Sequence, residues 1–149
     1  MKRVLFFVTV VLSVFCAAFA QAQDARPQKA VIGVFSWEMT ARSGTWVTFL
    51  IIEDVAMDGK LLGREIVITP EKKRLETSFG DAAEAKVSLE DRKPKVRIEF
   101  KGGAGPRKYA LNLYQTYLGG RFSKTLQNGY LFETDATFKP TSLASLPAS

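Results

Sequence analysis

The chain has 149 residues, of which 46% are hydrophobic and 24% charged, with a formal net charge of +6 and no histidine. Its one cysteine, Cys16, lies in an apolar N-terminal run, so the rest of the chain carries neither thiol nor imidazole. These absences exclude disulfide bonds, the ordinary zinc, haem and copper sites, cysteine nucleophiles and a Ser-His-Asp triad from that part. We therefore predict no catalytic constellation, no metal site and no cofactor.

The N-terminus has the pattern of an export signal peptide covering residues 1–22. Two basic residues precede the apolar run Val4–Phe19, and Ala18, Ala20 and Ala22 supply the small side chains that a signal peptidase reads. The alternative is an uncleaved anchor, but the run is shorter than the ~20 residues that a membrane-spanning helix needs. We expect a periplasmic or secreted protein without a transmembrane segment after signal removal.

The remaining charge is mildly basic. Without Lys2 and Arg3, 19 basic and 15 acidic residues remain, a net charge of +4. Such an excess favours anionic envelope components as partners, whereas the dispersed pattern of an exported chain does not favour nucleic acid. Basic clusters adjoin several predicted turns and would form an anion-attracting rim if they met at one end of the fold: Lys72-Lys73-Arg74, Arg92-Lys93-Lys95 and Arg107-Lys108.

The first half of the chain predicts three long strands. Ala30–Thr40 alternates in character. Trp46–Val55 is unusually apolar from Val47 to Ile52, so that strand must be covered on both faces or start a closed barrel. A third strand, Leu61–Thr69, follows a tight turn at Met57–Lys60, where Asp-Gly between apolar runs is a strong hairpin signal. This hairpin is the centre of the predicted fold.

The middle of the chain contains one ambiguous segment. After a short strand at Arg74–Phe79, the segment Asp81–Glu90 combines high helix propensity with strict alternation of apolar and polar residues. We favour a strand, because periodicity outranks propensity. Val96, Ile98 and Phe100 then alternate with charged residues, as expected of a half-exposed strand.

The last third predicts further hairpin-connected strands. Arg107–Gln115, Arg121–Lys124 and Tyr130–Lys139 have strand character, and Gln127–Gly129 contains the hairpin dipeptide Asn-Gly. The total is eight or nine strands at roughly ten-residue spacing, which is typical of a barrel or sandwich. We predict an all-β antiparallel meander that closes into a small β-barrel, with a β-sandwich as the alternative.

These elements define one domain at residues 23–139. Its length suffices to bury a core without disulfide bonds. The segment 140–149 is rich in Ser, Ala and Pro, so we expect a flexible C-terminal tail.

Three short motifs resemble the calycin barrels, the avidin and lipocalin group. Gly44-Thr45-Trp46 opens a long strand, and the rhythm of apolar strand, turn and Leu-x-Gly recurs at Leu61-Leu62-Gly63 and Tyr117-Leu118-Gly119. The resemblance implies a small exported barrel that holds a small ligand. The predicted strand before Gly44 departs from the calycin pattern, and no binding residue is carried over.

Aromatic side chains are the candidate ligand-binding residues. Two tryptophans flank the predicted turn at 41–44 and could form a stacking platform at the barrel mouth, and tyrosines enrich the C-terminal third. Ordinary core packing is the alternative interpretation of the same residues. The candidates are Trp37, Trp46, Tyr109, Tyr114 and Tyr130.

Three functions are compatible with this inventory. The first is a non-enzymatic barrel that binds a small apolar or glycan ligand or an envelope component. The second is a structural or protein-interaction domain with a packed interior and no ligand. The third is a His-free hydrolase or isomerase, for which carboxylates at Glu53, Asp54, Glu133 and Asp135 would have to converge across a cleft.

Overall fold

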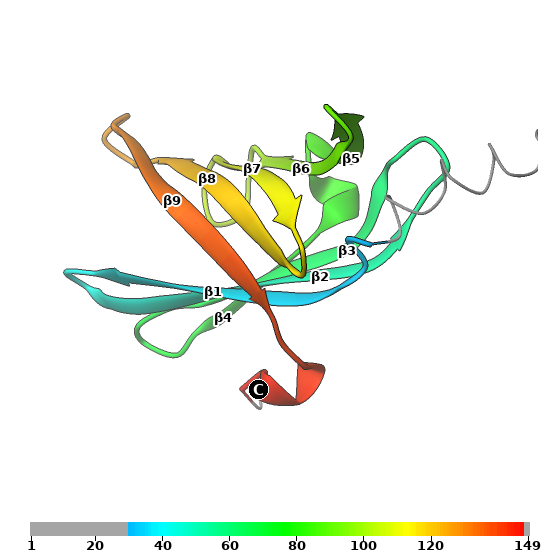
Figure 1. Ribbon diagram of the computed structural model, residues 1–149. Coiled ribbons are helices and arrows are strands. Elements are labelled where there is room, and N and C mark those ends of the chain that lie inside the picture. Colours follow the sequence, from blue (N-terminus) through cyan, green and yellow to red (C-terminus); the bar gives the residue numbers. More distant parts are fainter. Residues whose placement is uncertain (1–29, 148–149) are drawn as a thin grey trace, which may run out of the picture.

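Nine antiparallel strands form one sheet in the computed structural model, which describes residues 30–147 (Figure 1). The sheet order is β4-β3-β2-β1-β9-β8-β7-β6-β5, which confirms the predicted all-β meander. The predicted signal peptide lies outside the described residues. The elements are β1 (Gly33–Ala41), β2 (Gly44–Val55), β3 (Leu61–Ile68), β4 (Arg74–Ser78), η1 (Phe79–Asp81), β5 (Glu84–Glu90), β6 (Lys93–Phe100), β7 (Arg107–Tyr114), β8 (Tyr117–Thr125), β9 (Leu131–Pro140) and η2 (Leu143–Ser145).

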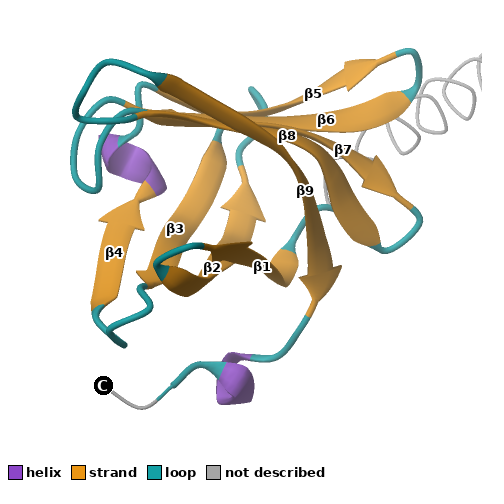
Figure 2. Cartoon of the chain, turned by 90° about the vertical axis from the view of Figure 1, so that its left-hand side faces the viewer, coloured by secondary structure: helices purple, strands orange, loops and turns teal. Residues whose placement is uncertain are grey.

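The sheet curls strongly into a half-barrel with two walls. Figure 2 shows β5–β9 across the top and β1–β4 below. β1 and β9 join the walls along a short seam, in which Phe35 pairs with Pro140 and Ser36 pairs with Lys139. The outer strands of the two walls, β4 and β5, are not neighbours in the sheet order. Instead, the turn before β3 reaches β5, where the Val87 amide donates to the carbonyl of Gly59 at 2.8 Å.

The two predicted Asx-Gly turns are both present and are built alike. Gly59 has φ +85° and its amide donates to the carbonyl of Ala56 at 2.9 Å. Gly129 has φ +79° and its amide donates to the carbonyl of Leu126 at 2.9 Å. Glycine adopts this left-handed backbone without the steric cost that a Cβ would impose. The Asp-Gly and Asn-Gly signals therefore predicted both turns correctly.

β2 is buried on both of its faces, as its apolar sequence predicts. Leu50 and Ile52 point into the interior and join the main core. Phe49 and Ile51 belong to a second buried cluster on the outer face, against which Leu146 packs from the segment after η2. The C-terminal segment thus covers the outside of this strand, and its predicted flexibility stays a prediction.

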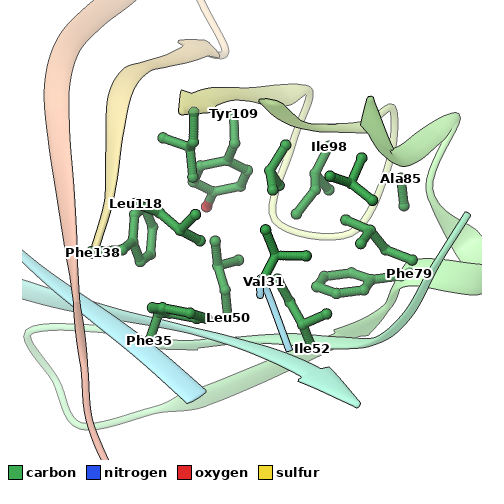
Figure 3. Packing of buried hydrophobic residues seen from close by; sticks show 14 of the residues in the cluster. Val31, Phe35, Leu50, Ile52, Phe79, Ala85, Ile98, Tyr109, Leu118 and Phe138 are labelled. Atoms are coloured by element: carbon green, nitrogen blue, oxygen red, sulfur yellow. The ribbon is translucent and has the colours of Figure 1, made fainter. Parts of the chain in front are cut away.

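The main core fills the middle of the space between the walls. Figure 3 shows Tyr109 and Ile98 projecting from the upper wall toward Leu50 and Ile52 of the lower wall. Aromatic side chains extend this core toward one end of the half-barrel, where the rings of Tyr109 and Phe122 lie 5.1 Å apart between centroids. The interior is consequently a packed core in its centre.

The ambiguous segment at 81–90 is mainly a strand. Its residues from Glu84 form β5, with Ala85 and Val87 buried, while η1 is a single 3-10 turn that buries Phe79. Alternation therefore prevailed over helix propensity, because β5 packs one face on the core. Among residues 30–147, no helix is both long and apolar enough to cross a bilayer.

Candidate functional site

A cavity of about 280 Å³ lies at the end of the interior that the packed core leaves open. It is enclosed by the β1–β2 hairpin, by strands β3, β7, β8 and β9, and by the loop between β6 and β7. Its wall combines nine apolar with five polar or charged residues: Trp37, Met39, Ala41, Trp46, Val67, Ala104, Phe122, Leu126 and Phe132, and Ser43, Thr48, Arg107, Tyr109 and Lys124. Three of the five predicted ligand-binding residues, Trp37, Trp46 and Tyr109, are in this wall.

The two tryptophans share the inner face of the β1–β2 hairpin. Met39 pairs with Trp46 across the ladder, so Trp37, two residues earlier, points to the same side. Trp37 packs on Phe122 with ring centroids 5.3 Å apart. The indole nitrogen of Trp46 donates to Ser43 Oγ at 3.3 Å. Both indole rings are therefore held in place on one wall of the cavity.

A buried ion pair joins Arg107, a residue of the cavity wall, to Glu65 of β3. The side chains of Glu65 and Arg107 are only 1% and 2% exposed. Arg107 Nε donates to both carboxylate oxygens of Glu65, at 3.0 and 2.9 Å, and Arg107 Nη2 and the Tyr109 hydroxyl also donate to that carboxylate. Buried charges are stable only when paired and hydrogen-bonded, and here two side chains of one strand in the opposite wall, β7, satisfy the carboxylate.

Arg107 also fixes the loop between β6 and β7. Its Nη1 donates to the carbonyls of Gly102 and Gly105, each at 3.0 Å, and its Nη2 donates to Thr77 Oγ1 at 3.1 Å. The guanidinium carbon lies 4.2 Å from the ring centroid of Phe100. The expectation that Arg107 belongs to an exposed basic rim is therefore wrong, because its side chain is buried and bonded to residues of the interior.

The surroundings shift the pKa values of the buried groups. Burial lowers the pKa of Arg107, but the hydrogen bonds and negative charge of Glu65 outweigh burial and raise it above the ordinary value. Burial, followed by the charge of Glu65, raises the pKa of Tyr109 well above 10.0. Arg107 thus stays charged and Tyr109 stays neutral throughout the neutral pH range.

Lys124 is a cation in the cavity wall. Its Nζ lies 5.6 Å from the ring centroid of Trp46, within the range of a cation–π contact. It stands directly across the ladder from Arg107. Burial and the charge of Arg107 lower the pKa of Lys124, while the charge of Glu65 acts in the opposite sense. Within residues 30–147, no ion pair includes Lys124.

The other two predicted ligand-binding residues lie away from the cavity. Tyr114 stacks on Tyr117 with centroids 5.4 Å apart and is 40% exposed. Tyr130 is 66% exposed at the turn before β9. The alternation of side chains along a strand already predicts that Tyr114 and Tyr109 lie on opposite faces, because residues five apart on one strand point in opposite directions.

The carboxylates considered for hydrolysis lie apart from the cavity. Glu53 is bound to Arg64 at 2.8 Å, and Asp135 lies 3.5 Å from Arg121 on the exposed side of the sheet. In the described part of the chain, no cluster of three or more His, Cys, Asp or Glu side chains could hold a metal ion. Glu65, which sequence reasoning did not single out, accepts hydrogen bonds from Arg107 and Tyr109, two residues of the cavity wall.

The arrangement combines aromatic and aliphatic walls with few free polar groups. Such a cavity can hold a small molecule by burial of apolar surface and orient it through the groups that remain free. The chain matches no protein-family model, and comparison with curated proteins and with solved structures likewise gave no match.

Proposed function

We propose that this protein is a periplasmic or secreted binding protein that holds a small, mainly apolar ligand beside Trp37 and Trp46. The observation that carries the proposal is the cavity of about 280 Å³ with a mostly apolar wall, at the open end of an otherwise packed interior. Ligand pockets of small-molecule binding proteins are typically concave, apolar and provided with a few polar groups.

The state of the polar groups favours an apolar ligand over a glycan. A sugar needs many hydrogen-bonding partners, but Arg107 and Tyr109 already direct their donors to Glu65 and, for Arg107, to the neighbouring loop. Ser43 accepts from Trp46. A sugar in this cavity would leave hydroxyls unsatisfied, which is costly in a buried site.

Export and a calycin-like ancestry belong to the same proposal. Residues 1–22 supply the signal-peptide pattern, and Gly44-Thr45-Trp46 opens β2 with its tryptophan on the cavity wall, as a ligand-holding barrel would use it. The up-and-down order of the strands supports the relationship, and the position of β1 ahead of the motif departs from it.

A direct titration tests the proposal. Trp37 and Trp46 are the only tryptophans of the chain and both line the cavity, so intrinsic fluorescence reports on its occupancy. A neutral two-ring probe, 2-naphthamide, should bind with a dissociation constant on the order of 0.1 mM, taking about 0.4 kcal/mol for each of about 13 non-hydrogen atoms. Calorimetry should give the same constant.

Two variants locate the binding site. Trp46→Ala should weaken binding about fivefold, because it removes aromatic contact worth about 1 kcal/mol. Tyr130→Ala, a change of an exposed aromatic residue outside the cavity, should leave the affinity unchanged. Native mass spectrometry of protein from its own envelope should reveal a co-purifying small molecule. Absence of both a native ligand and probe binding would instead support the alternative of a structural domain with a packed interior.

A further inference from the structure

Building on that proposed function, we infer that the cavity selects a ligand that carries one carboxylate on a planar apolar ring, and that Lys124 binds the carboxylate. Lys124 is then a specificity-determining residue, while the tryptophan wall holds the ring.

The charges around the cavity do not balance. Glu65 is negative, whereas Arg107 and Lys124 are both positive and face each other across the β7–β8 ladder. Arg107 forms an ion pair with Glu65 through several hydrogen bonds, so the positive charge of Lys124 remains. Like charges in directly opposed positions destabilise a sheet, and a half-buried cation without a partner adds to that cost. One ligand carboxylate would neutralise the excess.

The position of Lys124 suits it to bind a ligand. Its side chain lines the cavity and is half-buried, and its ammonium lies near the face of Trp46. A charge in such a partly desolvated place attracts an anion more strongly than one in water. Burial and Arg107 lower the pKa of Lys124, and a bound carboxylate would raise it again. The exposed lysines of the fold lack this combination of burial and cavity lining.

The remaining wall specifies the body of the ligand. Trp37 and Trp46 occupy the same face of one hairpin, and Phe122 and Phe132 extend the aromatic lining from β8 and β9. Planar rings pack efficiently on such side chains in offset or tilted contacts. The small volume of about 280 Å³ favours a ligand of one or two rings over a long-chain lipid.

A matched pair of probes tests the inference. 2-Naphthoate and 2-naphthamide have the same ring and nearly the same shape but differ by one negative charge. The wild-type protein should bind the naphthoate about tenfold more tightly at pH 7, as expected for a charge-assisted hydrogen bond. Lys124→Met should abolish that preference by weakening naphthoate binding about tenfold, with naphthamide binding unchanged, and Lys124→Arg should retain it.

A control separates local from general electrostatics. Lys108→Met removes one positive charge from the residue next to Arg107 on β7. This lysine is exposed, and its Nζ lies 3.9 Å from Glu99. It should leave the affinities for both probes unchanged. Urea unfolding followed by tryptophan fluorescence verifies that each variant is folded.

The outcomes are distinguishable. Equal affinity of the wild-type protein for the two probes would overturn the inference and leave the proposed function intact, even if Lys124→Met failed to fold. Equal losses for both probes in a folded Lys124→Met would also overturn it, since Lys124 would then only shape the cavity. If neither probe bound the wild-type protein, the inference would be wrong, and the proposed function would be wrong as well if no small molecule co-purified with the protein.

Discussion

Replacing Arg107 by methionine should destabilise the fold by about 3–5 kcal/mol, the usual cost of removing one partner of a buried ion pair. The guanidinium supplies bonds to Glu65, to the carbonyls of Gly102 and Gly105, and to Thr77. Without it, the Glu65 carboxylate, 1% exposed, would retain only the Tyr109 hydroxyl as a donor. Methionine keeps most of the apolar bulk, so the loss reports mainly on the uncompensated charge.

Urea unfolding monitored by the fluorescence of the two tryptophans measures this cost. A second variant, in which Arg107→Met is combined with Glu65→Leu, should be more stable than Arg107→Met alone, because it leaves no unpaired charge in the interior. The two changes should therefore be strongly non-additive.

The matched control is Arg121→Met, which breaks an exposed ion pair with Asp135 at 3.5 Å. It should not shift the urea midpoint measurably, because exposed pairs contribute little. A cost below about 1 kcal/mol for Arg107→Met, or additivity with Glu65→Leu, would refute the reasoning that the pair is a buried, mutually dependent unit.

Three further predictions concern the turns and the titrating groups. Gly63→Ala should cost more than about 2 kcal/mol and Gly129→Ala about 1 kcal/mol in urea unfolding, because both glycines have positive φ but only at Gly63 would a Cβ collide with a backbone carbonyl; equal costs would contradict the packing around Gly63. Tyr109 has a raised pKa, so its contribution to stability is complete below pH 10.0 and is lost as the pH rises above that value. Tyr109→Phe should be less stable at pH 7 yet show a shallower alkaline decline, and parallel alkaline slopes would argue against burial of the hydroxyl. The preference for naphthoate should begin to decline as the pH rises through the lowered pKa of the free Lys124 side chain, below the ordinary value of 10.5, while Arg107 stays charged and Tyr109 stays neutral. It should be lost above the higher pKa that Lys124 has beside the bound carboxylate. A preference that has not declined by pH 10.5 would exclude Lys124 as its source.

Local signals in the sequence predicted the strands and turns well. Asp58-Gly59 and Asn128-Gly129 each encode a backbone that glycine adopts easily, so the information is contained in two residues. The two-sided burial of β2 was equally readable, because an uninterrupted apolar strand must be covered on both faces.

The buried ion pair could not be predicted, because it depends on a β-bulge. The β2–β3 ladder shifts register between Ile52 and Asp54, so Glu65 stands opposite Leu50 and points inward. Without the shift, Glu65 would stand opposite Ile51, which lies on the outer face, and the inner faces of β2 and β3 would not match. A one-residue slip exchanges the two faces of a strand, and no local pattern marks this one apart from the glycine at position 63.

The sequence predicts only the part of the candidate site that follows from alternation along the strands; the rest depends on contacts between distant strands. Trp37 and Trp46 share a face by their spacing across a short hairpin, which the sequence predicts. Tyr109 reaches the cavity because β7 crosses above β3, a contact between residues 44 positions apart. Lys124 has no distinguishing sequence feature, since its importance arises from Arg107 being already engaged.

The short seam between β1 and β9 has a kinetic consequence. Each wall consists of hairpins between neighbours in the chain, which can form early, but Phe35 and Pro140 meet only after the whole intervening chain has been ordered. Because the seam contains two residue pairs, it should be the last part of the sheet to form during folding and the first to open in the native state. Since β1 carries Trp37 and β9 carries Phe132, opening of this seam would loosen two parts of the cavity wall together and allow a ligand to enter and leave.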